Sequence, residues 1–393
     1  MKLSSLTPRN VLHAAKMTLV IPEALAARCF RAAPWIVTER PDQARDNGYC
    51  FYRYLRETHP EQPAYYVIRR DSKDQEKLTA LGNVIDFDSW RHYFYFCFSK
   101  IHISAHTGGC NPSGNPFARY VKKLLGHTEV FLPHGVSYGV SEFCLAKYGV
   151  IDLFITSGKP EYDNVLAHYG YRPDQVAYTG FPRLDGWHHI KVNPKQIVLM
   201  PTWRMYLAQN PDTVFEETDY YRTYQGLLDS SALARLLDEY DLRLVFYPHN
   251  DMCKYIASFH TDCPRIEIAE RDEQYDIQEL LKSAALLITD YSSVHFDFAY
   301  MGKPVLYYQF DREEFWKKQY SQTDFDAAKD GFGPVAYDLS TLLENLQAAV
   351  KNGLKIEDKY YSRMRRFYEF YDEHNCDRVY EAIRGRLPDN ANM

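Results

Sequence analysis

The sequence predicts an α/β protein built from two doubly wound domains. Three observations lead to this class. The length of 393 residues suits two domains of about 150–200 residues each. Short apolar runs alternate with helix-like segments along the chain, as in parallel sheets whose crossover connections are helices. The composition, 46% hydrophobic and 25% charged, is that of a globular protein and excludes disordered and fibrous classes.

The first half of the chain contains seven candidate strands. Each is a short, mainly apolar run bounded by polar turns, the pattern of a strand buried on both faces of a sheet. Helix-like segments, such as residues 43–58, 75–81 and 161–169, separate them. The seven runs are Trp35–Thr38, Tyr65–Arg69, Val84–Phe87, Ile101–Ser104, Val130–Leu132, Leu153–Thr156 and Val176–Thr179.

The second half repeats this rhythm after an interruption at residues 187–195. Gly, His-His and Asn-Pro break the pattern there, so we expect a boundary between domains 1–190 and 191–393. Two domains of nearly equal size would then face each other across a cleft. The second half has four candidate strands: Ile197–Met200, Leu244–Tyr247, Leu286–Thr289 and Val305–Tyr308.

Charge and cysteine content exclude several classes of protein. The chain has 46 basic and 52 acidic residues, a net charge of −6, which argues against a nucleic-acid binder. No apolar run approaches the length of about 18 residues that a transmembrane helix needs. The eight cysteines include no C-x-x-C pair and suggest reduced thiols, not disulfides or a zinc site. We expect a cytoplasmic protein.

Unusual polar residues follow four of the candidate strands. In open α/β sheets, ligands bind at the carboxyl ends of strands, so these positions are the candidates for chemistry. A lone histidine at a strand end is usually structural, but two histidines, an arginine and a hydroxyl pair at equivalent positions favour a binding site. The four segments are Pro133-His134-Gly135, Pro201-Thr202-Trp203-Arg204, Pro248-His249-Asn250 and Asp290-Tyr291-Ser292-Ser293.

The last of these segments predicts an anion site. A strand, a hydroxyl-rich turn and then a helix place free backbone N–H groups and the positive end of a helix dipole together. Ser292 and Ser293 would add side-chain donors for a phosphate. The alternative is that one of these serines only caps the helix.

The same region strongly resembles the CDP-glycerol glycerophosphotransferase family. That family includes poly(glycerol phosphate) and related polymerases of teichoic acids and some capsules. The resemblance rests on Leu287–Val294 with Phe296–Ala299, on Lys303-Pro304-Val305 and on Asp311. Further matches lie at residues 35–40, 44–49, 180–185, 201–204 and 331–334, so the resemblance covers about residues 35–385.

This resemblance implies a GT-B fold, in which two Rossmann-like domains move a polyol phosphate from a CDP-linked donor. Residues 1–190 would form the acceptor side and residues 191–393 the donor side, with C-terminal helices. The loop Pro133–Tyr138 departs from the family pattern, because the tryptophan before the histidine is replaced and a following lysine is absent. His134 in this loop still matches the family's catalytic histidine. The departure leaves open which acceptor the chain uses and whether the polyol is glycerol or ribitol.

The resemblance and the strand-end chemistry together predict a site. His134 is the candidate general base, because an imidazole accepts protons near neutral pH. Arg204 can grip phosphate oxygens with two donors, and His249 can donate to the diphosphate. The expected donor and phosphate-binding residues are Gly135, Thr202, Ser292, Ser293, Asp290, Asp311 and Glu279; for Asp290 a structural turn, and for Glu279 a solvated helix face, remain open.

This electrostatic clamp requires no metal, and stimulation by a divalent cation is compatible with it. The expected partners are CDP-glycerol or a related CDP-polyol, and a glycan or lipid-linked acceptor. Residues 9–31 and 117–127 mix basic and apolar side chains. Such stretches are typical of ordinary helices over a core and also of helices on anionic lipid, so peripheral contact with the cytoplasmic face of a membrane stays open.

Other functions compete with this interpretation. A nucleotide-sugar glycosyltransferase would use the same scaffold, since a fold does not determine the donor. Gly135-Val136-Ser137-Tyr138-Gly139 fits the G-x-S-x-G pattern of serine hydrolases, with Ser137 as nucleophile. That assignment leaves Arg204 and the serine pair without a role. A catalytically inert, membrane-docked protein is a further alternative.

Overall fold

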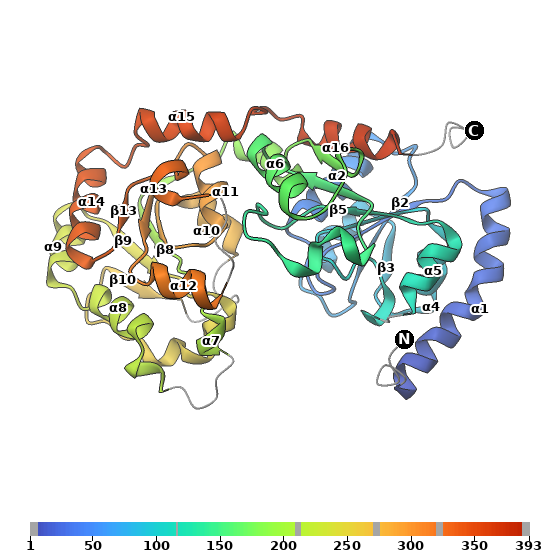
Figure 1. Ribbon diagram of the computed structural model, residues 1–393, viewed down its shortest axis with the longest axis horizontal. Coiled ribbons are helices and arrows are strands. Elements are labelled where there is room, and N and C mark those ends of the chain that lie inside the picture. Colours follow the sequence, from blue (N-terminus) through green and yellow to red (C-terminus); the bar gives the residue numbers. More distant parts are fainter. Residues whose placement is uncertain (1–6, 115–116, 209–213, 270–275, 320–324, 387–393) are drawn as a thin grey trace. The chain divides into compact units, whose positions relative to one another are not determined.

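The computed structural model describes residues 7–114, 117–208, 214–269, 276–319 and 325–386 (Figure 1). The chain divides into two compact units. The first comprises residues 1–137, 141–185 and 372–393, and the second comprises residues 138–140 and 186–371. The C-terminal residues therefore group with the first unit, whereas the sequence analysis assigns them to the second domain.

The first unit contains a seven-stranded parallel sheet in the order β3-β2-β1-β4-β5-β6-β7. All seven strands predicted for this half are present. Most of their residues are buried, as expected of strands covered on both faces. The strands are β1 (Trp35–Thr38), β2 (Ala64–Ile68), β3 (Val84–Asp86), β4 (Ile101–Ser104), β5 (Thr128–Phe131), β6 (Leu153–Thr156) and β7 (Val176–Tyr178).

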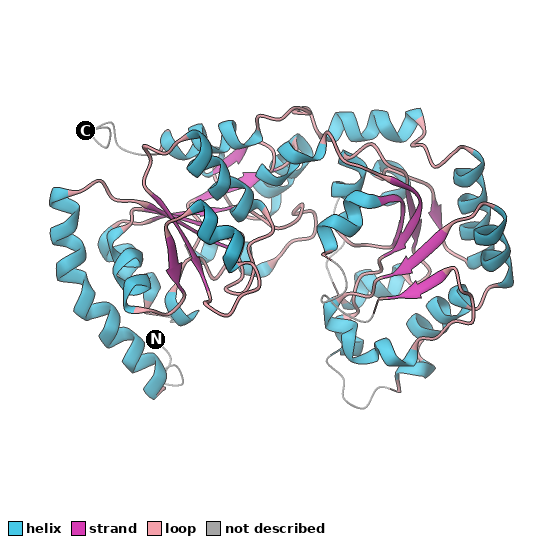
Figure 2. Ribbon diagram, turned by 180° about the vertical axis from the view of Figure 1, so that it is seen from behind, coloured by secondary structure: helices cyan, strands magenta, loops and turns pink. Residues whose placement is uncertain are grey.

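Helices lie on both faces of this sheet (Figure 2). Arg28, in the last turn of the first helix, donates to the carbonyls of Phe98 and Leu125 and thereby joins three helix ends. The helices are α1 (Pro8–Phe30), α2 (Asn47–Thr58), α3 (Gln75–Leu81), α4 (Trp90–Phe98), α5 (Ala118–Leu125), α6 (Lys159–His168) and α16 (Asn375–Arg384). No helix among the described residues is long and apolar enough to cross a membrane.

The second unit contains a six-stranded parallel sheet in the order β10-β9-β8-β11-β12-β13. The four predicted strands are present, and two short ones were not predicted: β10 (Ile266–Ile268) and β13 (Val335–Ala336). The predicted strands are β8 (Asn193–Leu199), β9 (Arg243–Phe246), β11 (Ala284–Thr289) and β12 (Val305–Tyr308). The helices are α7 (Met205–Ala208), α8 (Asp219–Leu228), α9 (Ser231–Glu239), α10 (Ile277–Ser283), α11 (Val294–Tyr300), α12 (Arg312–Lys318), α13 (Ala327–Asp330), α14 (Leu339–Lys351) and α15 (Asp358–Phe367).

Both sheets have a Rossmann-like strand order. In each unit the order reverses once, between β1 and β4 in the first and between β8 and β11 in the second. A crevice opens at the carboxyl ends of strands where such a reversal occurs, because the flanking connections leave in opposite directions. The loops that follow these strands are therefore where each unit is expected to bind its ligand.

Specific contacts hold α16 to the first unit. The Asp185 carboxylate accepts hydrogen bonds from the backbone N–H groups of Asn375 and Cys376, at 2.8 Å each, and so caps the start of α16. Gly180 has φ +82°, and a Cβ there would lie only 1.8 Å from the side chain of Asn375. The segment Gly180–Asp185, which resembles the family, thus receives the C-terminal helix.

Lys303 closes the carboxyl end of α10 in the second unit. It is 5% exposed, and its ammonium donates to three backbone carbonyls, those of Leu281, Lys282 and Ala284. An ammonium has three donors, so this arrangement uses all of them. Burial lowers the pKa of Lys303 to about 6, whereas the three carbonyl acceptors and the helix C-terminus favour its charged form.

We predict that Lys303→Met destabilises the second unit by about 2–4 kcal/mol, because it leaves buried carbonyls without a donor. The measurement is the free energy of unfolding from urea denaturation. Lys282→Met is the matched control, because that side chain is partly exposed in an ion pair with Glu279 and should cost about 1 kcal/mol or less. Equal effects of the two substitutions would contradict this role for Lys303.

Candidate functional site

His134 follows β5 in the first unit, near the point where the strand order reverses. Its side chain is exposed to solvent, and its ring stacks on that of His106, with centroids 5.4 Å apart. His106 follows β4, the neighbouring strand. The two imidazoles therefore come from adjacent strands at the carboxyl edge of the sheet, where ligands of such folds bind.

The loop that carries His134 is fixed on both sides. Before it, the Asn47 side-chain amide donates to the carbonyl of Pro133 at 2.6 Å. After it, the backbone of Ser137 donates to Glu161 at 2.6 Å and accepts from Asn164 at 2.8 Å. Glu161 is fully buried, and burial raises its pKa to about 7. His134 and the half-buried Gly135 thus lie between two anchored backbone points.

The surroundings of His134 favour its neutral form. Desolvation by the adjacent protein lowers its pKa below the ordinary 6.5, the charge of Asp46 acts in the opposite direction, and Arg183 and Arg40 lower it further. Burial and the neighbouring His134 lower the pKa of His106 to about 4. At neutral pH, His134 is therefore a free base that can accept a proton.

The structure gives no support to Ser137 as a hydrolase nucleophile. In a nucleophile elbow, a helix follows directly after the serine. Here the next element is a short 3₁₀ turn, Glu142–Cys144. The Ser137 hydroxyl interacts with Glu161 and Tyr169, which are not general bases paired with a nucleophile in the hydrolase pattern.

Arg204 occupies the centre of the second site, at the reversal between β8 and β11. Its side chain is fully buried. It pairs with Asp290 at 2.9 Å and with Asp311 at 2.7 and 3.0 Å, and it also donates to the Thr202 carbonyl at 2.7 Å. These contacts engage the guanidinium with protein groups, so the direct phosphate grip expected of Arg204 does not fit this geometry.

Asp290 and Asp311 both belong to this cluster around Arg204. One carboxylate oxygen of Asp290 accepts from the backbone N–H groups of Thr202 and Tyr291, at 2.8 and 2.6 Å. The other accepts from Arg204 and from the Tyr224 hydroxyl. Asp290 and Asp311 therefore organise the loops after β8, β11 and β12. Thr202 contributes its backbone, and its buried hydroxyl has no hydrogen-bond partner among the described residues.

His249, Ser292 and Ser293 retain side chains that a ligand can reach. The Ser293 hydroxyl makes no capping hydrogen bond with α11, which disfavours the cap-only alternative. Ser293 is exposed and Ser292 is half-buried. The His249 ring stacks on Trp203 at 5.9 Å, and its Nδ1 accepts from the Asp251 backbone at 3.2 Å. In the neutral ring this places the proton on Nε2, as a donor.

Glu279 has the geometry of a solvated helix face. It lies in the first turn of α10, is exposed, and pairs with Lys282 at 2.9 Å.

A separate cavity of about 470 Å³ adjoins Asp311. Four carboxylates and one lysine, Lys318, carry its charge, a balance that disfavours a diphosphate.

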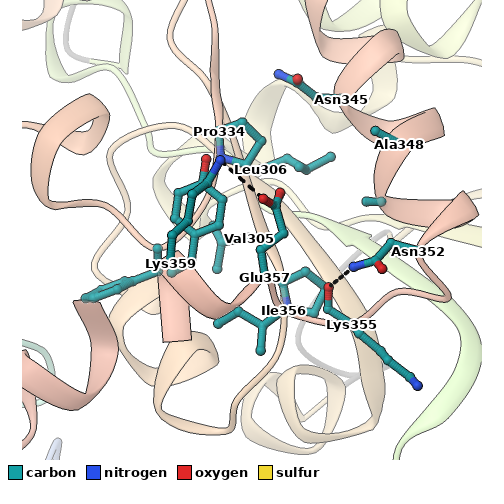
Figure 3. A pocket seen from close by; sticks show the side chains of 14 residues that line it. Val305, Leu306, Pro334, Asn345, Ala348, Asn352, Lys355, Ile356, Glu357 and Lys359 are labelled. Carbon is teal, nitrogen blue, oxygen red and sulfur yellow. Dashed lines mark hydrogen bonds and ion pairs between the residues drawn. The ribbon is translucent and has the colours of Figure 1, made fainter. Parts of the chain in front are cut away.

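Another cavity of about 460 Å³ is lined by residues of β12, α14 and α15 (Figure 3). Pro304 and Val305, the first residue of β12, line it, so it lies at the amino end of that strand. It has three charged side chains, of which Glu357 and Lys359 pair with each other at 3.2 Å and Lys355 is the third. We do not assign it to the candidate site. Among the described residues, no cluster of three or more His, Cys, Asp or Glu side chains could hold a metal ion.

A family model described as CDP-glycerol:poly(glycerophosphate) glycerophosphotransferase matches residues 34–385, which include most of both units. The chain belongs to this family. The match confirms the resemblance drawn from the strand-end motifs. The residues of both candidate sites lie within it.

Two curated relatives have names from teichoic acid synthesis. The minor teichoic acid biosynthesis protein GgaB of Bacillus subtilis (strain 168) is 32% identical over 366 residues, covering 90% of this chain and 40% of GgaB. The teichoic acid poly(glycerol phosphate) polymerase of the same strain is 24% identical over 355 residues, covering 83% of this chain and 44% of the polymerase. This chain spans less than half the length of either relative.

Solved structures confirm the GT-B fold class. The wall teichoic acid polymerase TagF has a TM-score of 0.63 at 15% identity, covering 99% of this chain and 100% of that chain. UDP-GlcNAc 2-epimerase from Neisseria meningitidis has a TM-score of 0.51 at 11% identity, covering 90% and 99%. This member of the glycerophosphotransferase family shares with GT-B proteins an architecture of two Rossmann-like units.

We predict that Arg204→Met lowers the free energy of unfolding of the second unit by about 3–5 kcal/mol, because it leaves two buried carboxylates without their cation. His249→Ala, at an exposed and stacked ring, should cost about 1 kcal/mol. Urea denaturation of both variants measures the difference. If Arg204→Met left the stability unchanged and weakened donor binding, the result would contradict the structural role and favour direct binding of the donor phosphate by Arg204.

Proposed function

We propose that this chain transfers glycerol phosphate, or a related polyol phosphate, from a CDP-linked donor to a hydroxyl of a cell-surface glycan, with release of CMP. Teichoic-acid-like and capsule acceptors are the classes that fit. The single observation that carries the proposal is the family match over residues 34–385, which includes His134 and the loops around Arg204. The relative GgaB is a minor teichoic acid biosynthesis protein, which supports the acceptor class.

The proposed reaction needs a base on the acceptor side. The acceptor oxygen attacks the phosphorus next to glycerol, a new P–O bond forms, and the bond to the CMP oxygen breaks. His134 takes the proton that the acceptor hydroxyl loses, and its lowered pKa keeps it unprotonated at neutral pH. Positioning of the reactants usually makes the larger contribution to the rate of phosphoryl transfer, and base catalysis by His134 adds to it.

The second unit would hold the donor. His249, Ser292 and Ser293 can donate to diphosphate oxygens from loops at the carboxyl edge of the sheet. Arg204, Asp290 and Asp311 would act as positioning residues that fix the path of these loops. Preorganised donors of this kind stabilise charge that builds up in a transition state.

We predict that His134→Ala lowers CMP release from CDP-glycerol by about 100- to 10,000-fold, the usual contribution of a general base. The dissociation constant for CDP-glycerol should stay unchanged, because the donor groups lie in the second unit. Enzyme assay and donor titration measure the two quantities. Ser137→Ala is the control and should keep near wild-type activity, because the backbone contacts with Glu161 and Asn164 remain when the hydroxyl and its contacts with Glu161 and Tyr169 are lost. Wild-type turnover by His134→Ala would contradict the assignment.

We also propose that the first unit contacts an anionic membrane surface through α1 and α5, which would place the protein on the cytoplasmic face. The inward side of α1 packs Met17, Val20 and Ala24 into the core. Its outward side is apolar as well, with Leu19 70% exposed and Phe30 86% exposed. On α5, Leu124 is 73% exposed beside the exposed Lys123, and Figure 1 shows α1 near α4 and α5. A lipid-linked acceptor would suit this surface.

We predict that Leu19→Ser combined with Phe30→Ser abolishes flotation of the protein with vesicles that contain anionic lipid. The reason is the loss of the two most exposed apolar side chains of α1. Phe143→Ser is the control, because Phe143 is 78% exposed but lies outside α1 and α5. Equal flotation of all three proteins would contradict membrane contact through this surface.

A further inference from the structure

Two segments that resemble the family have no role in the proposed reaction so far. They are residues 44–49, at the start of α2, and residues 180–185, after β7. In the first unit, Asn47 of one segment contacts the loop that carries His134. The backbone N–H of Arg183, in the other segment, donates to Asn47, and the Arg183 charge acts on His134. Both side chains are buried.

Asn47 links the two segments to the peptide just before His134. Its side chain is fully buried. Its amide nitrogen donates to the Pro133 carbonyl at 2.6 Å, and its amide oxygen accepts from the backbone N–H of Arg183 at 3.1 Å. The Pro133 carbonyl and the His134 N–H belong to one planar peptide group. Asn47 therefore constrains the orientation of the backbone that enters His134.

Asp46 adds a charge contact to the same junction. Its carboxylate pairs with the Arg183 guanidinium at 2.8 Å, and the Arg183 side chain is only 1% exposed. The same carboxylate oxygen accepts from the backbone N–H of Asn47 and caps α2. Asp46, Arg183 and Arg40 all act electrostatically on His134, and His106 stacks on it.

Glu39 fixes the start of α2 in this position. It follows β1, is 5% exposed, and accepts from the backbone N–H groups of Arg45, Asp46 and Tyr49. A Cβ at Gly48 would lie 2.9 Å from the Glu39 side chain, so only glycine allows this approach. The Asn47 amide is thus held by rigid elements and can act as a fixed support.

We propose that Asp46 and Asn47 are positioning residues for His134, with Asn47 orienting the Pro133–His134 peptide and Asp46 balancing the charge of Arg183 beside the imidazole. The proposal rests on the role of His134 as the base in the proposed function. It gives both unexplained segments one shared role in the first unit.

The first test is the turnover of Asn47→Asp with CDP-glycerol. This substitution keeps the acceptor for Arg183 and replaces the donor to Pro133 by a carboxylate oxygen. We expect kcat to fall about 10- to 100-fold from misplacement of the base, with the dissociation constant for CDP-glycerol unchanged. Asn83→Asp is the matched control, because the Asn83 amide also donates to a backbone carbonyl, that of Ala64, at the amino end of the same sheet.

The second test is the pH profile of Asp46→Asn. The carboxylate of Asp46 raises the pKa of His134, so its removal lowers that pKa, while Arg40, Arg183 and His106 remain. The unprotonated base is the active form, and the acid limb of kcat/KM should therefore move to lower pH. Asp74→Asn is the control; Asp74 is also a buried partner of an arginine, Arg45, and should leave the limb in place.

The outcomes separate the two proposals. Absence of CMP release by the wild-type chain would reject the proposed function and this inference with it. An active wild type, together with wild-type kcat in Asn47→Asp, would reject the positioning role of Asn47 alone. If thermal melting finds Asn47→Asp unfolded, the Asp46→Asn profile decides: an acid limb that does not move overturns the inference.

Discussion

One guanidinium, buried between two carboxylates, determines the path of three loops in the second unit. Arg204 follows β8, Asp290 follows β11 and Asp311 follows β12, and their side chains meet within hydrogen-bond distance. Desolvation of three charges offsets most of their attraction, so such a triad adds little net stability and mainly selects one arrangement of the loops. Trp203, next to Arg204, carries the ring on which His249 stacks. The accessible donors of this unit thus depend on a group that no ligand needs to touch.

In the first unit, the loops at the sheet edge are held by buried carboxylates that accept hydrogen bonds from backbone N–H groups. Glu39 holds the start of α2, and Glu161 holds both the start of α6 and the backbone of Ser137. Burial raises the pKa of each to about 7, against the hydrogen bonds that favour the charged form. His134 lies on the loop between these supports. In both units, buried polar side chains organise the carboxyl edge of the sheet and leave more exposed residues for chemistry.

The strands that the sequence predicted are the ones with clear apolar runs. Glu267 interrupts the apolar pattern of Ile266–Ile268, and Val335–Ala336 has only two residues, so neither segment forms an apolar run that separates it from a loop. Arg204 was expected to bind phosphate because a strand-end arginine has that chemistry. The sequence does not reveal that two aspartates, 86 and 107 positions away, approach it. Asn47 carries no charge, and the sequence singles it out only as part of a family motif. Its role depends on contacts with residues that follow other strands, which the sequence does not reveal. For α16, nothing in the apolar pattern indicates which unit receives it.

Every residue role proposed for this chain depends on the transfer of a polyol phosphate from a CDP-linked donor. The most direct measurement is incubation of the protein with a glycan acceptor and, in separate reactions, CDP-glycerol, CDP-ribitol and UDP-GlcNAc, followed by mass spectrometry of the acceptor. We expect the acceptor to gain glycerol phosphate or ribitol phosphate and CMP to appear in equal amount. Transfer of the sugar from UDP-GlcNAc, with both CDP-polyols left intact, would contradict this expectation.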